Sequence, residues 1–221
     1  VRRQRQMCIR DSPNDVTQAY AIGKAYDGGQ FAELNCQAYG ALYQDVLTVP
    51  GATLNWSLAH AGRDGTDTMA LLIAPVDVAQ DITDALKNKT TRAAIQEALN
   101  GSITVNGVNV PIRNYIVDGN ISDGCTAWGV HNGTYTVPAG QYVSRFFFVA
   151  VASASGDSEE GLKRGNLIDR VWFSTDPVPP AAGSGILRVT KTLLKTDGTA
   201  LTDAELIQAC LLYTSDAADE L

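Results

Sequence analysis

Residues 53–74 read TLNWSLAHAGRDGTDTMALLIA. In the first part of this stretch, Leu54, Trp56 and Leu58 alternate with polar or small residues, which is typical of a strand with one buried face. Residues 67–74 form a second apolar run, and the segment Gly-Arg-Asp-Gly separates the two runs. A short Gly-rich turn between two strands favours a β-hairpin, so we expect these two strands to pair with each other.

Short strands are expected along most of the chain. Residues 143–153 (VSRFFFVAVAS) are apolar on both faces apart from Arg145, which predicts a strand in the centre of a sheet. Short strands between turn signals predict an all-β sandwich over residues 13–176. The other predicted strands cover residues 31–35, 41–48, 135–137 and 167–174.

A small helical insertion is expected at about residues 78–100. Apolar residues recur at helical spacing over 78–87 and again over 92–99. Thr91 is in the position of an N-cap for the second helix, and Asn100 and Gly101 form a stop signal at its end. A short hairpin over residues 103–112, with its turn at Asn106 and Gly107, should follow.

The composition excludes several classes of protein. The chain has 17 Lys and Arg against 24 Asp and Glu, a net charge of -7, and no basic stripe outside the arginine-rich residues 1–12, which argues against nucleic-acid binding. No apolar run approaches the roughly 20 residues of a membrane helix, so we expect no membrane-embedded segment here. Cys36 and Cys125 are expected either to form one disulfide or to be two buried free thiols.

The two ends of the chain look like translated DNA adapter. One choice of codons for residues 2–12 (RRQRQMCIRDS) has a reverse complement that translates as CLLYTSDAAD, which is the sequence of residues 210–219. The shared DNA resembles the transposon-end adapter of sequencing libraries. We therefore expect residues 1–12 and 210–221 to be artefacts, and residues 13–209 to be an internal window of a longer reading frame.

A linker and the start of a second domain are expected near the C-terminus. Residues 177–185 (PVPPAAGSG) are Pro-rich and then Gly/Ser-rich, as in a linker that is stiff at first and flexible later. In the strand predicted at 186–195 (ILRVTKTLLK), Lys191 lies in the row expected to face a core. The VTKT and DGT segments of residues 186–209 resemble the start of the immunoglobulin-like pilin and collagen-adhesin B-type domains of Gram-positive surface proteins.

That resemblance implies a role for Lys191. In that family, a lysine of the first strand attacks an Asn side chain of the last strand to form an intramolecular isopeptide crosslink. Lys191 would be the amine, and its acceptor and helper acid would lie beyond residue 209. The alternative is a lysine on an edge strand that extends its ammonium group to water.

The larger region, about residues 28–174, resembles the galactose-binding-like jelly rolls of secreted bacterial surface proteins. The resemblance implies a jelly-roll β-sandwich, and it implies a structural calcium held by Glu33 and Asp169, since Ca²⁺ prefers carboxylate oxygens. Alternatively, Glu33 or Asp169 pairs with Arg63 or Arg145. The segments that carry the resemblance are FAELN (31–35), LYQ (42–44), VPG (49–51), the strand with Trp56, residues 60–63, VPAGQ (137–141) and GNLID (165–169).

Three residues are candidates for glycan binding. Trp128, His131 and Asn132 are close together in the segment AWGVHNG, which we interpret as a loop that places an aromatic ring beside polar groups. Alternatively, Trp128 packs against the helical insertion and His131 is solvated. Trp172 is either a contact between elements or an exposed aromatic platform, whereas Trp56 is expected in the core.

No catalytic motif appears in the sequence: there is no GxSxG, no HExxH and no Gly-rich phosphate loop. We therefore expect a non-catalytic, adhesin-like module of a secreted or wall-anchored bacterial surface protein, with host or environmental glycans or proteins as partners. The alternative hypotheses are a carbohydrate-binding module and a region appended to a glycosidase. No cofactor is expected apart from the calcium ion.

Overall fold

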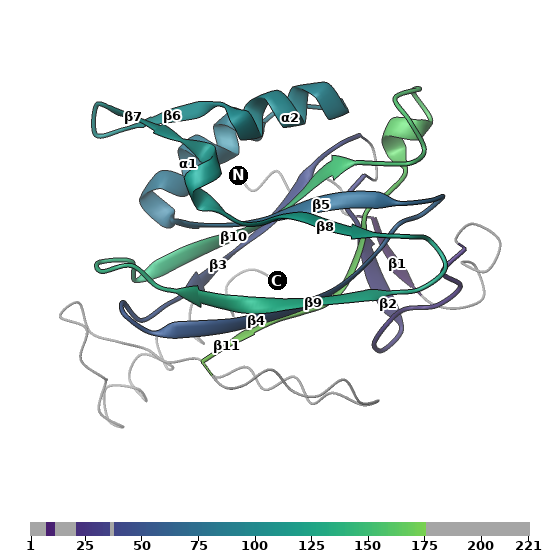
Figure 1. Cartoon of the computed structure of the whole chain (residues 1–221), viewed down its shortest axis with the longest axis horizontal. Coiled ribbons are helices and arrows are strands. Elements are labelled where there is room, and N and C mark those ends of the chain that lie inside the picture. The colour runs from purple at the N-terminus through teal and green to yellow at the C-terminus, as the bar shows by residue number, and fades with distance from the viewer. Residues whose placement is uncertain (1–7, 12–20, 36–37, 176–221) are drawn as a thin grey trace, which may run out of the picture. The chain divides into compact units, whose positions relative to one another are not determined.

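The computed structural model describes residues 8–11, 21–35 and 38–175, which fold into two antiparallel β-sheets (Figure 1). The five-stranded sheet has the order β1-β2-β11-β4-β9, and the four-stranded sheet has the order β3-β10-β5-β8. The strands of the first sheet are β1 (Cys8–Asp11), β2 (Gln30–Glu33), β11 (Leu167–Ser174), β4 (Thr53–Ala61) and β9 (Gly129–Thr136). Those of the second are β3 (Ala41–Leu47), β10 (Val143–Ala152), β5 (Asp67–Pro75) and β8 (Ile116–Asp123). The predicted jelly-roll β-sandwich is confirmed.

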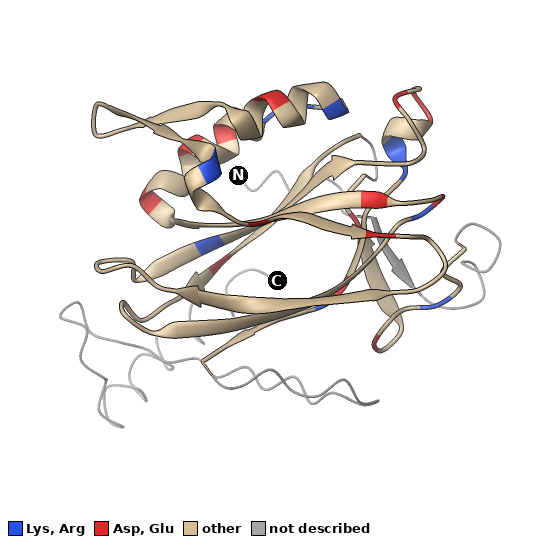
Figure 2. Ribbon diagram, in the orientation of Figure 1, with Lys and Arg blue, Asp and Glu red and all other residues tan. Residues whose placement is uncertain are grey.

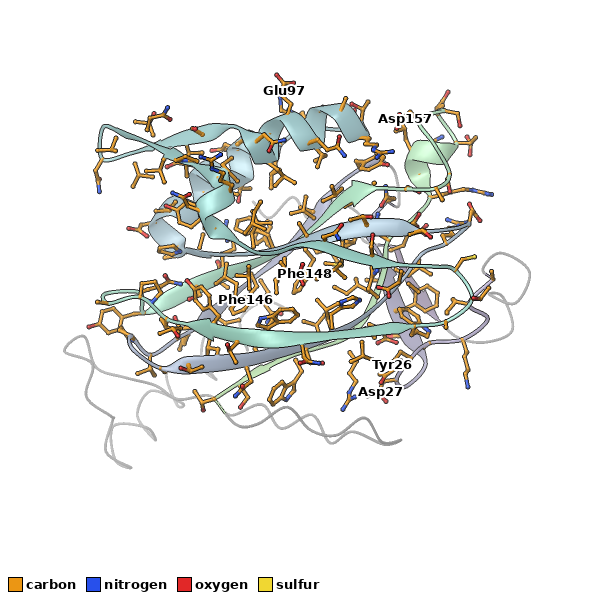
Figure 3. The ribbon with its side chains drawn as sticks, in the orientation of Figure 1. Tyr26, Asp27, Glu97, Phe146, Phe148 and Asp157 are labelled. Atoms are coloured by element: carbon orange, nitrogen blue, oxygen red, sulfur yellow. The ribbon has the colours of Figure 1, made fainter. Side chains whose placement is uncertain are left out.

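The core lies between the two sheets. Phe146 and Phe148 of β10 point from the four-stranded sheet toward the five-stranded one (Figure 3), and the ring centroid of Phe146 lies 3.9 Å from that of Phe173 on β11. Trp56 of β4 is 3% exposed, which confirms its predicted place in the core. Its indole ring packs on the backbone of Gly133, where a Cβ atom would lie 2.8 Å from the ring. Apolar burial between the sheets therefore supplies the main stabilisation of the sandwich.

The predicted hairpin of residues 53–74 is wrong, because its two strands lie in different sheets. Strand β4 pairs with β11 and β9, whereas β5 pairs with β10 and β8. The chain crosses from one sheet to the other between Gly62 and Asp67. A Cβ atom on Gly62 would lie 1.9 Å from the carbonyl oxygen of Gly65, so this crossing requires glycine. The Gly-rich segment is thus a connection between layers, not a hairpin turn.

Asp67 holds this crossing in place. Its carboxylate is fully buried and accepts backbone N–H groups from Arg63 (2.9 Å), Ala154 (2.8 Å) and Asn166 (2.9 Å). Three charge-assisted hydrogen bonds compensate for the cost of burying the carboxylate. One side chain therefore connects three segments that are distant in the sequence.

The predicted helical insertion is confirmed, but it covers the outer face of the four-stranded sheet, whereas the sequence favoured one end of the sandwich (Figure 1). It consists of α1 (Val76–Leu86), α2 (Arg92–Asn100) and the hairpin of β6 (Ser102–Val105) and β7 (Val108–Pro111). Thr91 caps α2 by accepting the N–H of Ala94. Asn106 and Gly107 have φ values of 50° and 79°, as a two-residue hairpin turn requires. Short 3-10 helices follow at η1 (Ile112–Tyr115) and η2 (Gly161–Lys163).

Strand β1 pairs through its backbone with β2, so that Cys8 lies opposite Glu33. An open sheet edge can pair with any extended segment, so this pairing does not test whether residues 1–12 are translated adapter. That interpretation stays a prediction.

Cys125 forms no disulfide, and Cys36 lies outside the described residues. The linker at 177–185, the segment 186–209 with Lys191, and residues 210–221 also lie outside them. No helix in the described part of the chain is long and apolar enough to cross a membrane.

Candidate functional site

The three predicted glycan-binding residues do not form one site. His131 and Asn132 belong to strand β9, not to a loop, and therefore point to opposite sides of the five-stranded sheet. Trp128 precedes the strand; its ring contacts that of Phe31 with centroids 5.8 Å apart, and its indole N–H donates to the carbonyl of Lys24 (2.9 Å). Trp128 therefore belongs to a small apolar cluster with Phe31 and does not pack on the insertion.

Two glycines make the sequence of β9 similar to that of a loop. A Cβ atom on Gly129 would lie 1.8 Å from Oδ1 of Asp123. A Cβ atom on Gly133 would likewise collide with the indole ring of Trp56. Glycine is usually a turn signal, but here two glycines make room for side chains that face the strand.

His131 belongs to a polar network between the sheets. Its Nε2 lies 2.7 Å from Oδ2 of Asp123, and Nδ1 of the fully buried His60 lies 2.8 Å from the same oxygen. The Nε2 atom of His60 lies 3.1 Å from Oδ1 of Asn166. His60 and His131 come from the five-stranded sheet and Asp123 from the four-stranded sheet, so the network joins the two layers.

The protons of this network follow from its partners. Nδ2 of Asn166 donates to the carbonyl of Ala152 and to Oδ1 of Asn35, so Oδ1 of Asn166 faces His60 and accepts its Nε2–H. Nδ1 of His60 then faces a carboxylate, and the bond forms only if His60 or Asp123 holds an additional proton. Burial raises the pKa of Asp123, but its hydrogen bonds with His60 and His131 outweigh burial, so the pKa of Asp123 is lowered overall.

No catalytic triad is built on this pair. Among the described residues, no serine, threonine or cysteine side chain forms a hydrogen bond with His60 or His131. A histidine acting as a general base needs a nucleophile within hydrogen-bonding reach. Both histidines instead lie within hydrogen-bonding distance of the same oxygen of Asp123.

The carboxylates of Glu33 and Asp169 each have N–H partners within the chain. Glu33 forms a 2.6 Å ion pair with Arg63, as the alternative interpretation predicted, and accepts the N–H of Gly165. Asp169 accepts the backbone N–H groups of Tyr26 (2.7 Å) and Asp27 (3.1 Å), and burial raises its pKa. The described residues contain no group of three His, Cys, Asp or Glu side chains that could hold a metal ion. Calcium binding by Glu33 and Asp169 stays a prediction.

Asn132 lies on the outer face of the five-stranded sheet. It is directly opposite Ser57 of β4, which is in turn opposite Trp172 of β11. Side chains that are opposite in antiparallel strands share a face, so Trp172 also points outward, where it is half-buried. Figure 2 shows that β4 and β9 carry no Lys, Arg, Asp or Glu. This face combines a Trp ring with short uncharged polar side chains.

A cleft of about 530 Å³ opens between the edge strands of the two sheets. Strand β8 forms one wall, strand β9 forms the other, and the start of α1 and the turn before β10 close its end. Its lining residues are Ile73, Pro75, Asp77, Asn114, Tyr115, Ile116, Val117, Thr134, Tyr135, Thr136, Pro138, Ala139, Gly140 and Gln141.

Two tyrosines dominate the chemistry of the cleft. Burial raises the pKa of both Tyr115 and Tyr135, so both phenols stay neutral and can donate a hydrogen bond. The hydroxyl of Tyr135 donates to Oε1 of the buried Gln141 (3.3 Å), whose Nε2 donates to Ser144 (2.6 Å). This chain of contacts holds the ring of Tyr135 in position. No sequence motif marks Tyr115 or Tyr135 as a site residue.

No protein-family model and no curated protein sequence matches the chain. A family 35 carbohydrate-binding module from Clostridium thermocellum is similar in structure at 11% identity, with a TM-score of 0.39 over 76% of this chain and 86% of that one. The CBM22-1 xylan-binding domain of Paenibacillus barcinonensis Xyn10C has 10% identity and a TM-score of 0.40 over 76% and 83%. A CBM4 structure has 12% identity and a TM-score of 0.34. The match covers 61% of this chain and 59% of the CBM4 chain. Similarity at this level carries no function over to this chain.

Proposed function

We propose that this chain is a non-catalytic carbohydrate-binding module and that it holds a glycan in the cleft between β8 and β9. The observation that carries the proposal is a cleft of ligand size, about 530 Å³, lined by two tyrosine rings and by amide and hydroxyl groups. Binding sites for small ligands typically measure 300–1,000 Å³ and combine aromatic walls with a few polar groups.

The lining residues match the two kinds of surface that a sugar presents. The apolar faces of Tyr115 and Tyr135 can stack on the C–H face of a pyranose ring, because an aromatic ring combines a large apolar area with a polar end. The side chain of Asn114 and the backbone of the edge strand β9 supply donors and acceptors for the ring hydroxyls. A neutral ligand rich in hydroxyl groups would use both surfaces at once.

The cleft is also partly ordered in advance. Tyr135 is fixed by Gln141, which is itself held by Ser144, and Thr48 donates to the backbone carbonyl of Gln141 (3.0 Å). A side chain that is already held in place loses less conformational entropy when a ligand binds. Preorganisation of this kind supports recognition without a large closing motion.

The adhesin-like role and the extracellular location stay predictions. The resemblance that suggests them rests in part on Lys191, which lies outside the described residues. A completed second domain should lose about 17 Da, one ammonia, if Lys191 forms the crosslink, because amide formation expels that group. An unchanged mass would refute the role of Lys191.

Calorimetry with an array of neutral oligosaccharides tests the binding site. We expect Tyr135→Ala to weaken binding about tenfold or more, because it removes a buried aromatic contact, and Tyr135→Phe to keep most of the affinity. Tyr142→Ala is the matched control, since Tyr142 is 47% exposed and does not line the cleft. Equal effects of Tyr135→Ala and Tyr142→Ala, with both variants folded by circular dichroism, would contradict the proposed site.

A further inference from the structure

We infer that the cleft selects among glycans by charge, and that it prefers a sugar carrying a protonated amine over a neutral or acidic sugar. This inference rests on the proposed glycan-binding function and specifies its ligand class. The observation behind it is that Asp77 is the one charged residue among those that line the cleft. Since the lining includes no lysine, arginine or histidine, the site offers no cationic partner to a carboxylate, sulfate or phosphate group.

The charge of Asp77 is not neutralised by a side chain. Asp77 is exposed in the first turn of α1, and it forms no ion pair in the described part of the chain. Arg113 belongs to the same short helix as Asn114 and Tyr115, but it does not line the cleft. The N-terminus of α1 carries a partial positive charge of about half a unit, which only partly offsets a full negative charge.

The two tyrosines add to the preference for a cation. The face of an aromatic ring attracts a positive charge, and Tyr115 and Tyr135 both line the cleft with Asp77. The negative charge of Asp77 helps, after burial, to raise the pKa of Tyr115, which agrees with a carboxylate and a phenol that lie close together. An ammonium group between them would meet one negative charge and two rings.

The charge of the whole chain works in the same direction. Its net charge of -7 attracts cationic ligands and repels polyanions before any specific contact forms. This long-range effect is general to the surface, however, so the experiment must separate it from the local effect of Asp77.

Two oligosaccharides provide the probe: an N-acetylglucosamine tetramer and its deacetylated glucosamine counterpart, in which a protonatable amine replaces each neutral acetamide. Their binding is measured by calorimetry at pH 6 and low salt. We expect the cationic tetramer to bind about five- to tenfold more tightly, the sum of one exposed charge pair and one cation–π contact. A tetramer of galacturonic acid should bind more weakly than either.

Asp77→Asn should abolish the preference, so that the cationic and the neutral tetramer bind this variant with equal affinity. Asp81→Asn is the control, because this substitution removes the same charge from the same helix. Asp81 is exposed and does not line the cleft. Equal losses in the two variants would assign the preference to net charge and overturn the inference.

Failure of the inference differs from failure of the proposed function. Equal affinity for the two tetramers, with both lost in Tyr135→Ala, would overturn charge selection and leave glycan binding in the cleft intact. Absence of binding to these tetramers and to every neutral oligosaccharide of the array would overturn both.

Discussion

At the scale of the residue, the central feature is a carboxylate shared by two histidines between the sheets. Asp123 lies within hydrogen-bonding distance of both His60 and His131, and its side chain is 16% exposed. The sequence contains only two histidines, and nothing in their spacing indicates that both reach one aspartate. Strand register brings the three residues together, and register cannot be read from the sequence around His131.

This network predicts a dependence of stability on pH. The pKa of Asp123 is lower in the folded state than its ordinary value of 3.8, so the ionised carboxylate stabilises the fold. That stabilisation is complete above the unfolded pKa and is lost as the pH falls through the lower folded value. The free energy of unfolding, measured with urea between pH 2 and 6, should decrease toward the acidic end of this range. The decrease should be smaller in Asp123→Asn than in the unmodified protein. The same acid dependence in both proteins would contradict the role of Asp123.

A second residue-scale prediction concerns the glycine that faces this carboxylate. Gly129→Ala places a Cβ atom on Asp123, so the carboxylate must move and the unfolding free energy should fall by about 1–3 kcal/mol. Gly124→Ala is the control, because a Cβ atom there meets nothing within 4 Å. Thermal unfolding of the two variants should therefore differ; equal stability would mean that Gly129 has no steric role.

At the scale of the element, the apolar strands and the helical insertion can be predicted from the sequence, but the pairing of strands within each sheet cannot. The strands at 143–153 and 167–174 appear within a residue or two of their predicted bounds, because continuous or alternating apolar residues mark buried strands. Strand β8 and the first part of β9 were missed, since Gly, Asp and Asn interrupt their pattern. The hairpin error shows that a local turn signal does not specify which sheet receives the next strand.

The crossing between β4 and β5 yields a prediction at this scale. Asp67→Asn should destabilise the fold by about 2–3 kcal/mol, because an amide NH₂ group would face N–H donors that a carboxylate now satisfies. Asp64→Asn, in the same connection but exposed, should change the unfolding free energy by less than about 1 kcal/mol. Chemical denaturation of both variants gives the comparison, and equal losses would refute a special role for Asp67.

At the scale of the whole molecule, the cleft arises from the way the sandwich is closed. Strands β8 and β9 are edge strands of opposite sheets, and the cleft lies between them. Its residues come from the end of β5, the start of α1, η1 with β8, β9 and the turn before β10. No pattern in the sequence connects these segments, so Tyr115 and Tyr135 could not be identified as partners before the fold was known. Asn132 is exposed on a different face, and its predicted role in glycan binding stays a prediction.

A crystal structure with a bound oligosaccharide tests the central claim most directly, because two surfaces of this fold combine aromatic and polar groups. The cleft account predicts a sugar ring in contact with Tyr115 and Tyr135, with its hydroxyls bonded to Asn114 or to the backbone of β9. A sugar bound instead on the outer face of the five-stranded sheet, against Trp172 and Asn132, would contradict it.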